Sequence, residues 1–351
     1  MTAMAHLAAS IGRAPMLRDR TNAIATAILG AVMAYAGFRF VKWGIVNAIW
    51  SLPPDAGSQA CRVARGDGAC WAVIAERFRF ILCGAYPFAE QWRPAVACLL
   101  FVTLYAASTV RTWWNWRLLG LWILLPAAAV TLLGGGLLGL SYVPSEFWGG
   151  LPLTFLLSTV GFAVAFPLAV ALALGRRSEL PAIKGLCIAY IELVRGVPLV
   201  TFLFMAVVMF PLFVPQGLTM DKLLRVQVAL VMVIAAYVAE VIRGGLQAIP
   251  RGQYEAAASI GLSYWPSTIL IVLPQALRVS IPALVNTFIA FFKDTSLVVV
   301  IGLFDLLGAA KAVIVDAKWV ASASRSISSS PSAISRSAMA CRSTASTSSV
   351  C

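Results

Sequence analysis

The chain has 351 residues, of which 60% are hydrophobic and 12% charged, and its formal net charge is +13. A soluble domain cannot bury so large an apolar fraction, because much of its residue content must form a surface in contact with water. The composition therefore excludes an ordinary soluble protein and predicts an all-α polytopic membrane protein, and the absence of a basic stripe interleaved with aromatic residues argues against nucleic-acid binding.

Seven apolar stretches are long enough to cross a bilayer, which takes about twenty residues or slightly fewer. An eighth stretch, near 296–320, carries four charged residues, and we do not expect it to span. The seven predicted spans are 22–40, 94–110, 118–140, 151–175, 197–215, 226–242 and 279–293.

Basic residues in the short loops predict the orientation, because such residues concentrate on the cytoplasmic side of a membrane. Arg111, Arg117 and Arg177 lie in loops that this rule places inside. We therefore expect a cytoplasmic N-terminal tail, 1–21, and a periplasmic loop, 51–93, although that loop also contains five arginines.

Two features near the predicted outer loop leave alternatives open. Residues 39–50 mix aromatic side chains with Arg39 and Lys42, which suits either an interfacial helix or an extension of the first span. Cys61 and Cys70 flank a Gly-Asp-Gly turn that can bring the two thiols together. In the oxidising periplasm this pair is a candidate disulfide, with two free thiols as the alternative.

The segment between the sixth and seventh predicted spans is polar, whereas both of its neighbours are apolar. Pro250–Gly252 predicts a turn, and Gln253–Ile260 favours a helix that Gly261 can terminate. Ser263 can cap the next helix, and Pro274 can kink it or begin a further segment. This pattern predicts a compact knob outside the bilayer, whose small alanines let a partner surface approach closely.

The same segment resembles the signature of the permease subunits of binding-protein-dependent ABC importers. Glu255-Ala256-Ala257 is followed by three residues, Gly261, nine residues and then Ile271-Val272-Leu273-Pro274. Further segments resemble those of polar amino acid permeases, and together the matches cover about 150–308. These further segments are Ile191–Leu199, Glu240–Gly245 and Phe292–Leu297.

The resemblance implies a type I ABC importer permease fold with a MetI-like core. The core domain would be 151–310, including a cytoplasmic coupling loop, 243–278. The preceding three-span extension, 22–150, looks like that of the AapM-type, HisM-like permeases of general L-amino acid importers.

The C-terminal part, 311–351, departs from this pattern. The family continues into one more span and a short basic end, whereas this chain turns to serine, alanine, threonine and arginine from about residue 321. Such a composition predicts a disordered tail. A reading-frame shift near 308–322 would produce the change and would remove the final span.

By resemblance, the chain is the transmembrane subunit of an importer that moves L-amino acids across the bacterial inner membrane. Its implied partners are a second permease subunit, identical or different, a cytoplasmic ABC ATPase dimer, a periplasmic amino acid-binding protein and the lipid bilayer. The residues expected to couple it to the ATPase are Glu255, Ala256, Ala257, Gly261, Ile271 and Pro274.

No catalytic centre is expected in this chain. It lacks a G-x-x-x-x-G-K-[ST] phosphate loop, so ATP and Mg²⁺ are expected to bind the partner ATPase. Its single histidine, His6, belongs to no cluster of metal ligands. The chain is therefore expected to be a transport subunit without its own cofactor or metal.

Charged residues within apolar segments are further candidates, because a charge at membrane depth usually faces a partner or a pathway. Lys293, Asp294 and Thr295 either line the amino acid pathway or, in the structural alternative, Lys293 and Asp294 pair with each other at the outer interface. The i,i+3 spacing of Glu192 and Arg195 predicts a structural ion pair.

Two other functions compete with the importer interpretation. A secondary transporter would carry a repeat and intramembrane ion ligands, and no clear repeat is evident here. A non-transport membrane scaffold or sensor is the other alternative. Neither gives a reason for the segment that begins at Glu255.

Overall fold

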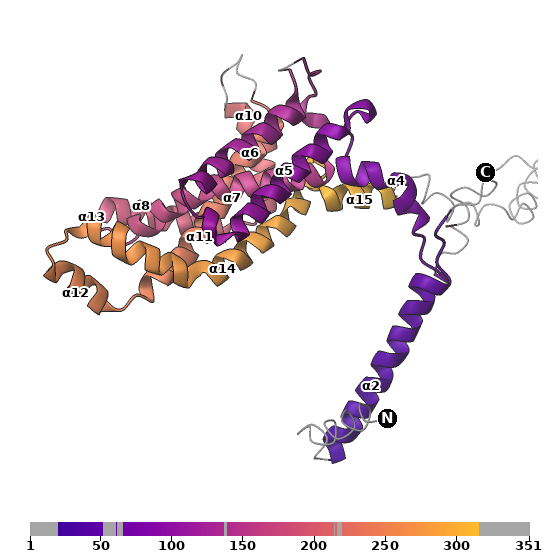
Figure 1. Cartoon of the computed structure of the whole chain (residues 1–351), viewed down its shortest axis with the longest axis horizontal. Coiled ribbons are helices and arrows are strands. Elements are labelled where there is room, and N and C mark those ends of the chain that lie inside the picture. The colour runs from indigo at the N-terminus through magenta and orange to yellow at the C-terminus, as the bar shows by residue number, and fades with distance from the viewer. Residues whose placement is uncertain are drawn as a thin grey trace, which may run out of the picture. The chain divides into compact units, whose positions relative to one another are not determined.

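The computed structural model describes residues 20–51, 61, 66–136, 139–213, 215 and 220–315. The chain divides into two compact units, Met1–Arg77 with Val313–Cys351, and Phe78–Ala312. Most of the predicted N-terminal tail and the Ser-rich tail beyond Val315 lie outside the described residues. Helices dominate the described part, as predicted (Figure 1).

In the first unit, helix α2, Arg20–Val41, continues directly into the π-helix η2, Lys42–Val46. The segment that follows Arg39 is therefore an extension of the first span, and no separate interfacial helix forms there. Cys61 and Cys70 are joined by a disulfide across a Cα–Cα distance of 5.6 Å, within the usual range for such bonds.

The second unit is a bundle of long helices linked by short turns (Figure 1). Helix α4 runs from the first unit into the second. The elements are α4 Ala72–Cys83, η3 Phe88–Glu90, α5 Trp92–Thr109, η4 Arg111–Trp113, α6 Trp116–Gly134, η5 Ser145–Phe147, α7 Gly150–Gly175, α8 Pro181–Gly196, α9 Leu199–Phe204, η6 Met205–Met209, α10 Phe210–Phe213, α11 Lys222–Gln247, α12 Arg251–Ser259, α13 Tyr264–Ser267, η7 Thr268–Val272, α14 Leu273–Asp294, η8 Thr295–Ile301 and α15 Leu306–Val315.

The described residues contain six helices long and apolar enough to cross a membrane. A seventh candidate is the pair formed by α8 and the helical segment Leu199–Phe213, which bend by 100° where they meet. These positions agree with the seven predicted spans, but the last span belongs to a 38-residue helical run, Tyr264–Ile301, which begins well before the predicted residue 279. Pro274 is accommodated there by the π-helix η7, because the wider turn relieves the clash of the proline ring with the preceding turn.

Small residues let the central helices of the bundle pack closely. Helix α11 packs along α7 and crosses α14, and alanines are buried on both α7 and α11. At Gly245 a Cβ would lie only 2.6 Å from the carbonyl oxygen of Ala276, so only glycine fits this crossing. Close approach through small residues is the usual way in which helices associate in membranes.

The start of α15 is anchored within the second unit. The buried Asp305 carboxylate accepts a hydrogen bond from the backbone N–H of Gly308 at 2.7 Å and caps the helix. The Thr154 hydroxyl accepts from the backbone N–H of Leu306 at 3.0 Å. Helix α15 continues to Val315, so the first five residues of the predicted tail, 311–315, are helical.

Candidate functional site

The polar segment predicted as a knob forms two short helices at one end of the bundle (Figure 1). We call residues 251–267 the α12–α13 turn. Gly261 ends α12 with a φ of +80°, the left-handed conformation that favours glycine. The backbone N–H of Leu262 donates to Ala257 O at 3.1 Å, and that of Gly261 to Ala258 O at 3.0 Å. This hydrogen-bond pair is a Schellman motif, and the turn is therefore fixed by its own backbone.

Side chains on its inner face attach the α12–α13 turn to two long helices. The Arg177 guanidinium, just beyond α7, donates to the Tyr254 hydroxyl at 2.9 Å. Gln275, in α14, donates to the Gln253 side-chain oxygen at 3.0 Å. Ala257 is only 1% exposed. A force applied to the turn would therefore be transmitted to α7 and α14.

The α12–α13 turn exposes large apolar side chains and one carboxylate. Ile260 is 71% exposed and Trp265 60% exposed, and Tyr264 also faces outward. Glu255 is exposed and forms no ion pair or hydrogen bond with any residue that the structure describes. An exposed apolar cluster on an otherwise polar segment is typical of a protein-binding surface.

The second half of the predicted motif, Ile271–Pro274, lies where this turn connects to α14. Ile271 lies in the π-helix η7, and its carbonyl accepts a hydrogen bond from the Gln275 side chain at 3.0 Å. Pro274 is at the start of α14. Ser263 is at the N-cap of α13, but its side chain makes no capping hydrogen bond, and the predicted side-chain cap is wrong.

Five charged residues from three helical segments gather close to the α12–α13 turn, and we call them the arginine–glutamate cluster. Glu240 is bonded to Arg243, contacts Arg176 at 3.3 Å and lies 3.9 Å from Arg195. Glu192 contacts Arg176 at 3.0 Å. The predicted pairing of Glu192 with Arg195 is wrong, because each finds a partner on another segment.

The three predicted pathway residues have different surroundings. Asp294 lines a cavity of about 360 Å³ together with Tyr237 and Thr287. Lys293 is exposed and does not line this cavity, and among the described residues the two form no ion pair. Thr295 is buried, and its hydroxyl donates to the carbonyl of Phe292 at 2.9 Å, with the Asp305 carboxylate further away at 3.3 Å. Only Asp294 therefore faces a space that a solute could enter.

No group of three or more histidine, cysteine, aspartate or glutamate residues that could hold a metal ion is found within the described ranges.

The sequence alone did not identify the structural role of Arg176, Arg177 and Tyr254. In the sequence the two arginines indicated only the membrane orientation, because their partners lie on other helices, between 16 and 77 residues further along the chain.

Comparison with known proteins identifies the family to which the chain is similar. The family of binding-protein-dependent transport system inner membrane components matches residues 165–315. The inner membrane amino-acid ABC transporter permease protein YhdY of Escherichia coli (strain K12) is 44% identical over 286 residues, covering 80% of this chain and 75% of the relative. The glutamate/glutamine/aspartate/asparagine transport system permease protein BztC of Rhodobacter capsulatus is 37% identical, covering 72% of this chain and 71% of that protein.

A crystal structure of an amino acid ABC transporter with histidines is 33% identical, covers 47% of this chain and 76% of that chain, and has a TM-score of 0.43. The two long relatives match well over two thirds of the chain. The chain therefore belongs to the amino-acid ABC importer permeases, multi-pass transport subunits of the inner membrane that are not themselves enzymes.

Proposed function

We propose that the α12–α13 turn is the surface on which a cytoplasmic ATPase drives this permease. Importers of this family work with an ATPase and a substrate-binding protein. The observation that carries the proposal is the exposed apolar face around Ile260 and Trp265, on a turn held by Arg177 and Gln275. A partner that binds this face differently in its two conformations would shift the equilibrium between two arrangements of the helices to which the turn is attached.

The distribution of charge supports a cytoplasmic location for the turn. Arg176, Arg177, Arg243 and Arg251 lie at or near the end of the bundle that carries it. Such residues are enriched on the cytoplasmic side of membrane proteins. Counting the α8–α10 pair as one span, the N-terminus then lies in the cytoplasm, and the disulfide of Cys61 lies in the oxidising periplasm.

Replacing Trp265 by alanine is expected to release the ATPase from the purified complex. Truncating a central tryptophan in an interface costs about 2 kcal/mol or more, which is roughly thirtyfold in affinity. The measurement is the amount of ATPase that copurifies with a tagged permease from membranes containing both. Trp116→Ala is the matched control, because Trp116 is also highly exposed but is the first residue of α6, outside the α12–α13 turn. Wild-type retention of the ATPase by the Trp265 variant would refute the proposed docking surface.

We further propose that the cavity at Asp294 is part of the route of an L-amino acid, supplied by a periplasmic binding protein and shared with a second permease subunit. Asp294 is the only acidic residue among those that line the cavity. Its carboxylate would face the substrate ammonium group, while the Tyr237 and Thr287 side chains offer hydroxyls for hydrogen bonds. A carboxylate at membrane depth without a basic partner is a functional candidate on physical grounds.

Substituting Asp294 by asparagine is expected to lower amino acid uptake about tenfold or more, because a charge-assisted hydrogen bond to the ammonium group is lost. Uptake of a labelled amino acid into proteoliposomes containing the full importer measures this. Lys293→Gln is the control, because Lys293 does not line the cavity. ATPase copurification should be unchanged in both variants. Equal loss of uptake in the two variants would mean that the local charge matters rather than the cavity.

A further inference from the structure

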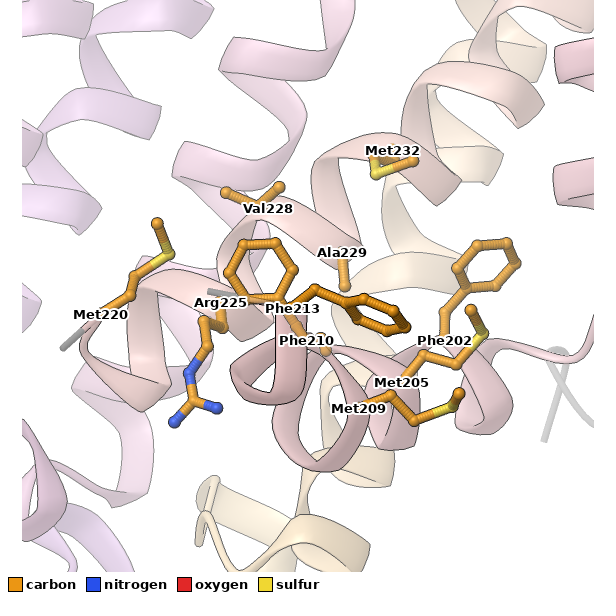
Figure 2. Close-up of a pocket in the computed structure, with 11 residues that line it drawn as sticks. Phe202, Met205, Met209, Phe210, Phe213, Met220, Arg225, Val228, Ala229 and Met232 are labelled. Carbon is orange, nitrogen blue, oxygen red and sulfur yellow. The ribbon is translucent and has the colours of Figure 1, made fainter. Parts of the chain in front are cut away.

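A second, strongly apolar groove lies at the other end of α11 (Figure 2). One wall is formed by α9, η6 and α10, which contribute Phe202, Met205, Met209, Phe210 and Phe213. The other wall is the start of α11, with Val228, Ala229 and Met232. The groove has a volume of about 300 Å³, and we call it the α9–α11 groove.

Arg225 is the single charged residue that lines the α9–α11 groove. Its guanidinium donates to the carbonyl of Val207, within the π-helix η6, at 2.8 Å. Its Nε is buried without a hydrogen-bond partner, and the residue forms no ion pair with any acidic group that the structure describes. The nearby Asp221 carboxylate is already bonded to the backbone N–H of Leu223 and the Ser145 hydroxyl.

The position of Arg225 along α11 places it near a membrane surface. A helix rises 1.5 Å per residue, so about 30 Å separate Arg225 from Gln247 at the other end. This distance is about the thickness of the hydrocarbon core of a bilayer. Arg225 therefore lies near the surface opposite the α12–α13 turn, while the apolar walls of the groove extend towards the membrane interior.

We propose that the α9–α11 groove binds one anionic phospholipid from this leaflet. One of its two acyl chains lies between the methionines and phenylalanines, and its phosphate lies on Arg225. Flexible methionine side chains adapt to an irregular chain, and a guanidinium is suited to bidentate binding of phosphate. An amino acid fits the groove poorly, because no acidic side chain is present among the lining residues to receive its ammonium group.

The experiment uses the complete importer in nanodiscs that contain equal amounts of phosphatidylglycerol and phosphatidylcholine. Lipids retained after mild detergent extraction are identified by native mass spectrometry. We expect Arg225→Gln to reduce the preference for phosphatidylglycerol about tenfold, because its negative charge, which choline balances in phosphatidylcholine, then loses its basic partner. Met209→Trp, at an exposed position that lines the groove, should remove the retained lipid of either type.

Lys222→Gln is the matched control, because Lys222 is a cation on the same turn of α11 that does not line the groove. This variant should retain lipid as the wild-type protein does. The proposal is overturned if Arg225→Gln keeps the wild-type preference, or if Lys222→Gln loses it equally. It is also overturned if Met209→Trp retains the same lipid, which would be the result if a partner permease filled the groove in the assembled importer.

Discussion

Replacing Gly261 by valine is expected to abolish amino acid uptake while the protein still folds and inserts. Gly261 has a φ of +80°, and no atom lies within 4 Å of the position that a Cβ would take. A side chain at position 261 is therefore unfavourable because of the backbone conformation that it must adopt, and not because of a steric clash. An L-residue pays about 1–2 kcal/mol in the left-handed region, and a β-branched residue is a genuine outlier there.

The valine variant is expected to relieve this strain by changing the direction in which the chain leaves α12. The hydrogen bonds that Leu262 and Gly261 donate to the last turn of the helix would then be lost. Because the turn lies at one end of the bundle (Figure 1), the packing of the long helices is preserved. The exposed Trp265 would move relative to Glu255, and the ATPase would meet a surface that no longer matches it.

Gly252→Val is the matched control for this experiment. Gly252 belongs to the same helix, is exposed and also has open space around it, but it lies in ordinary helical conformation. Valine there replaces a poor helix former and should leave uptake unchanged. The measurement is uptake into proteoliposomes. Membrane insertion is measured by the amount of the variant in the membrane fraction, and folding by its size-exclusion profile. Normal uptake by the Gly261 variant would show that the conformation of the turn does not matter for coupling.

Features that depend on neighbours in sequence were predictable from the chain alone. Span length is a local property of hydropathy, and the stop at Gly261 follows from the conformational freedom of glycine. A helix after Ser263 was predicted, but its continuation through Pro274 into the last span was left open, because Pro274 and Arg278 interrupt the apolar pattern. The π-helix that accommodates the proline is a response of the backbone that hydropathy does not encode.

Features that depend on distant partners were not predictable. Glu192 and Arg195 have the spacing of a helical ion pair, yet Arg176, from the end of α7, binds Glu192 instead. Thr295 was placed with the pathway residues on proximity in sequence, but the η8 turn directs it towards Asp305. For Glu192 a third segment, brought close only by folding, offers the better partner.

Glu240→Gln is expected to lower the free energy of unfolding by about 3 kcal/mol, because it leaves three arginines near one another without their shared carboxylate. The Glu240 side chain is 23% exposed, so water screens this repulsion only in part. A loss of this size corresponds to a fall in Tm of roughly 4–6 °C. Thermal unfolding of the detergent-solubilised protein, followed by tryptophan fluorescence, measures it.

Glu192→Gln is the matched control, because Glu192 is 56% exposed and contacts only Arg176 within the arginine–glutamate cluster. An exposed pair of this kind contributes about 1 kcal/mol or less, so its loss should change Tm little. Equal falls in the two variants would contradict the central role of Glu240. Arg176 is adjacent in sequence to Arg177, which holds Tyr254 in α12. Loosening the cluster should therefore also lower uptake at temperatures where the variant remains folded, because the support of the α12–α13 turn becomes less rigid.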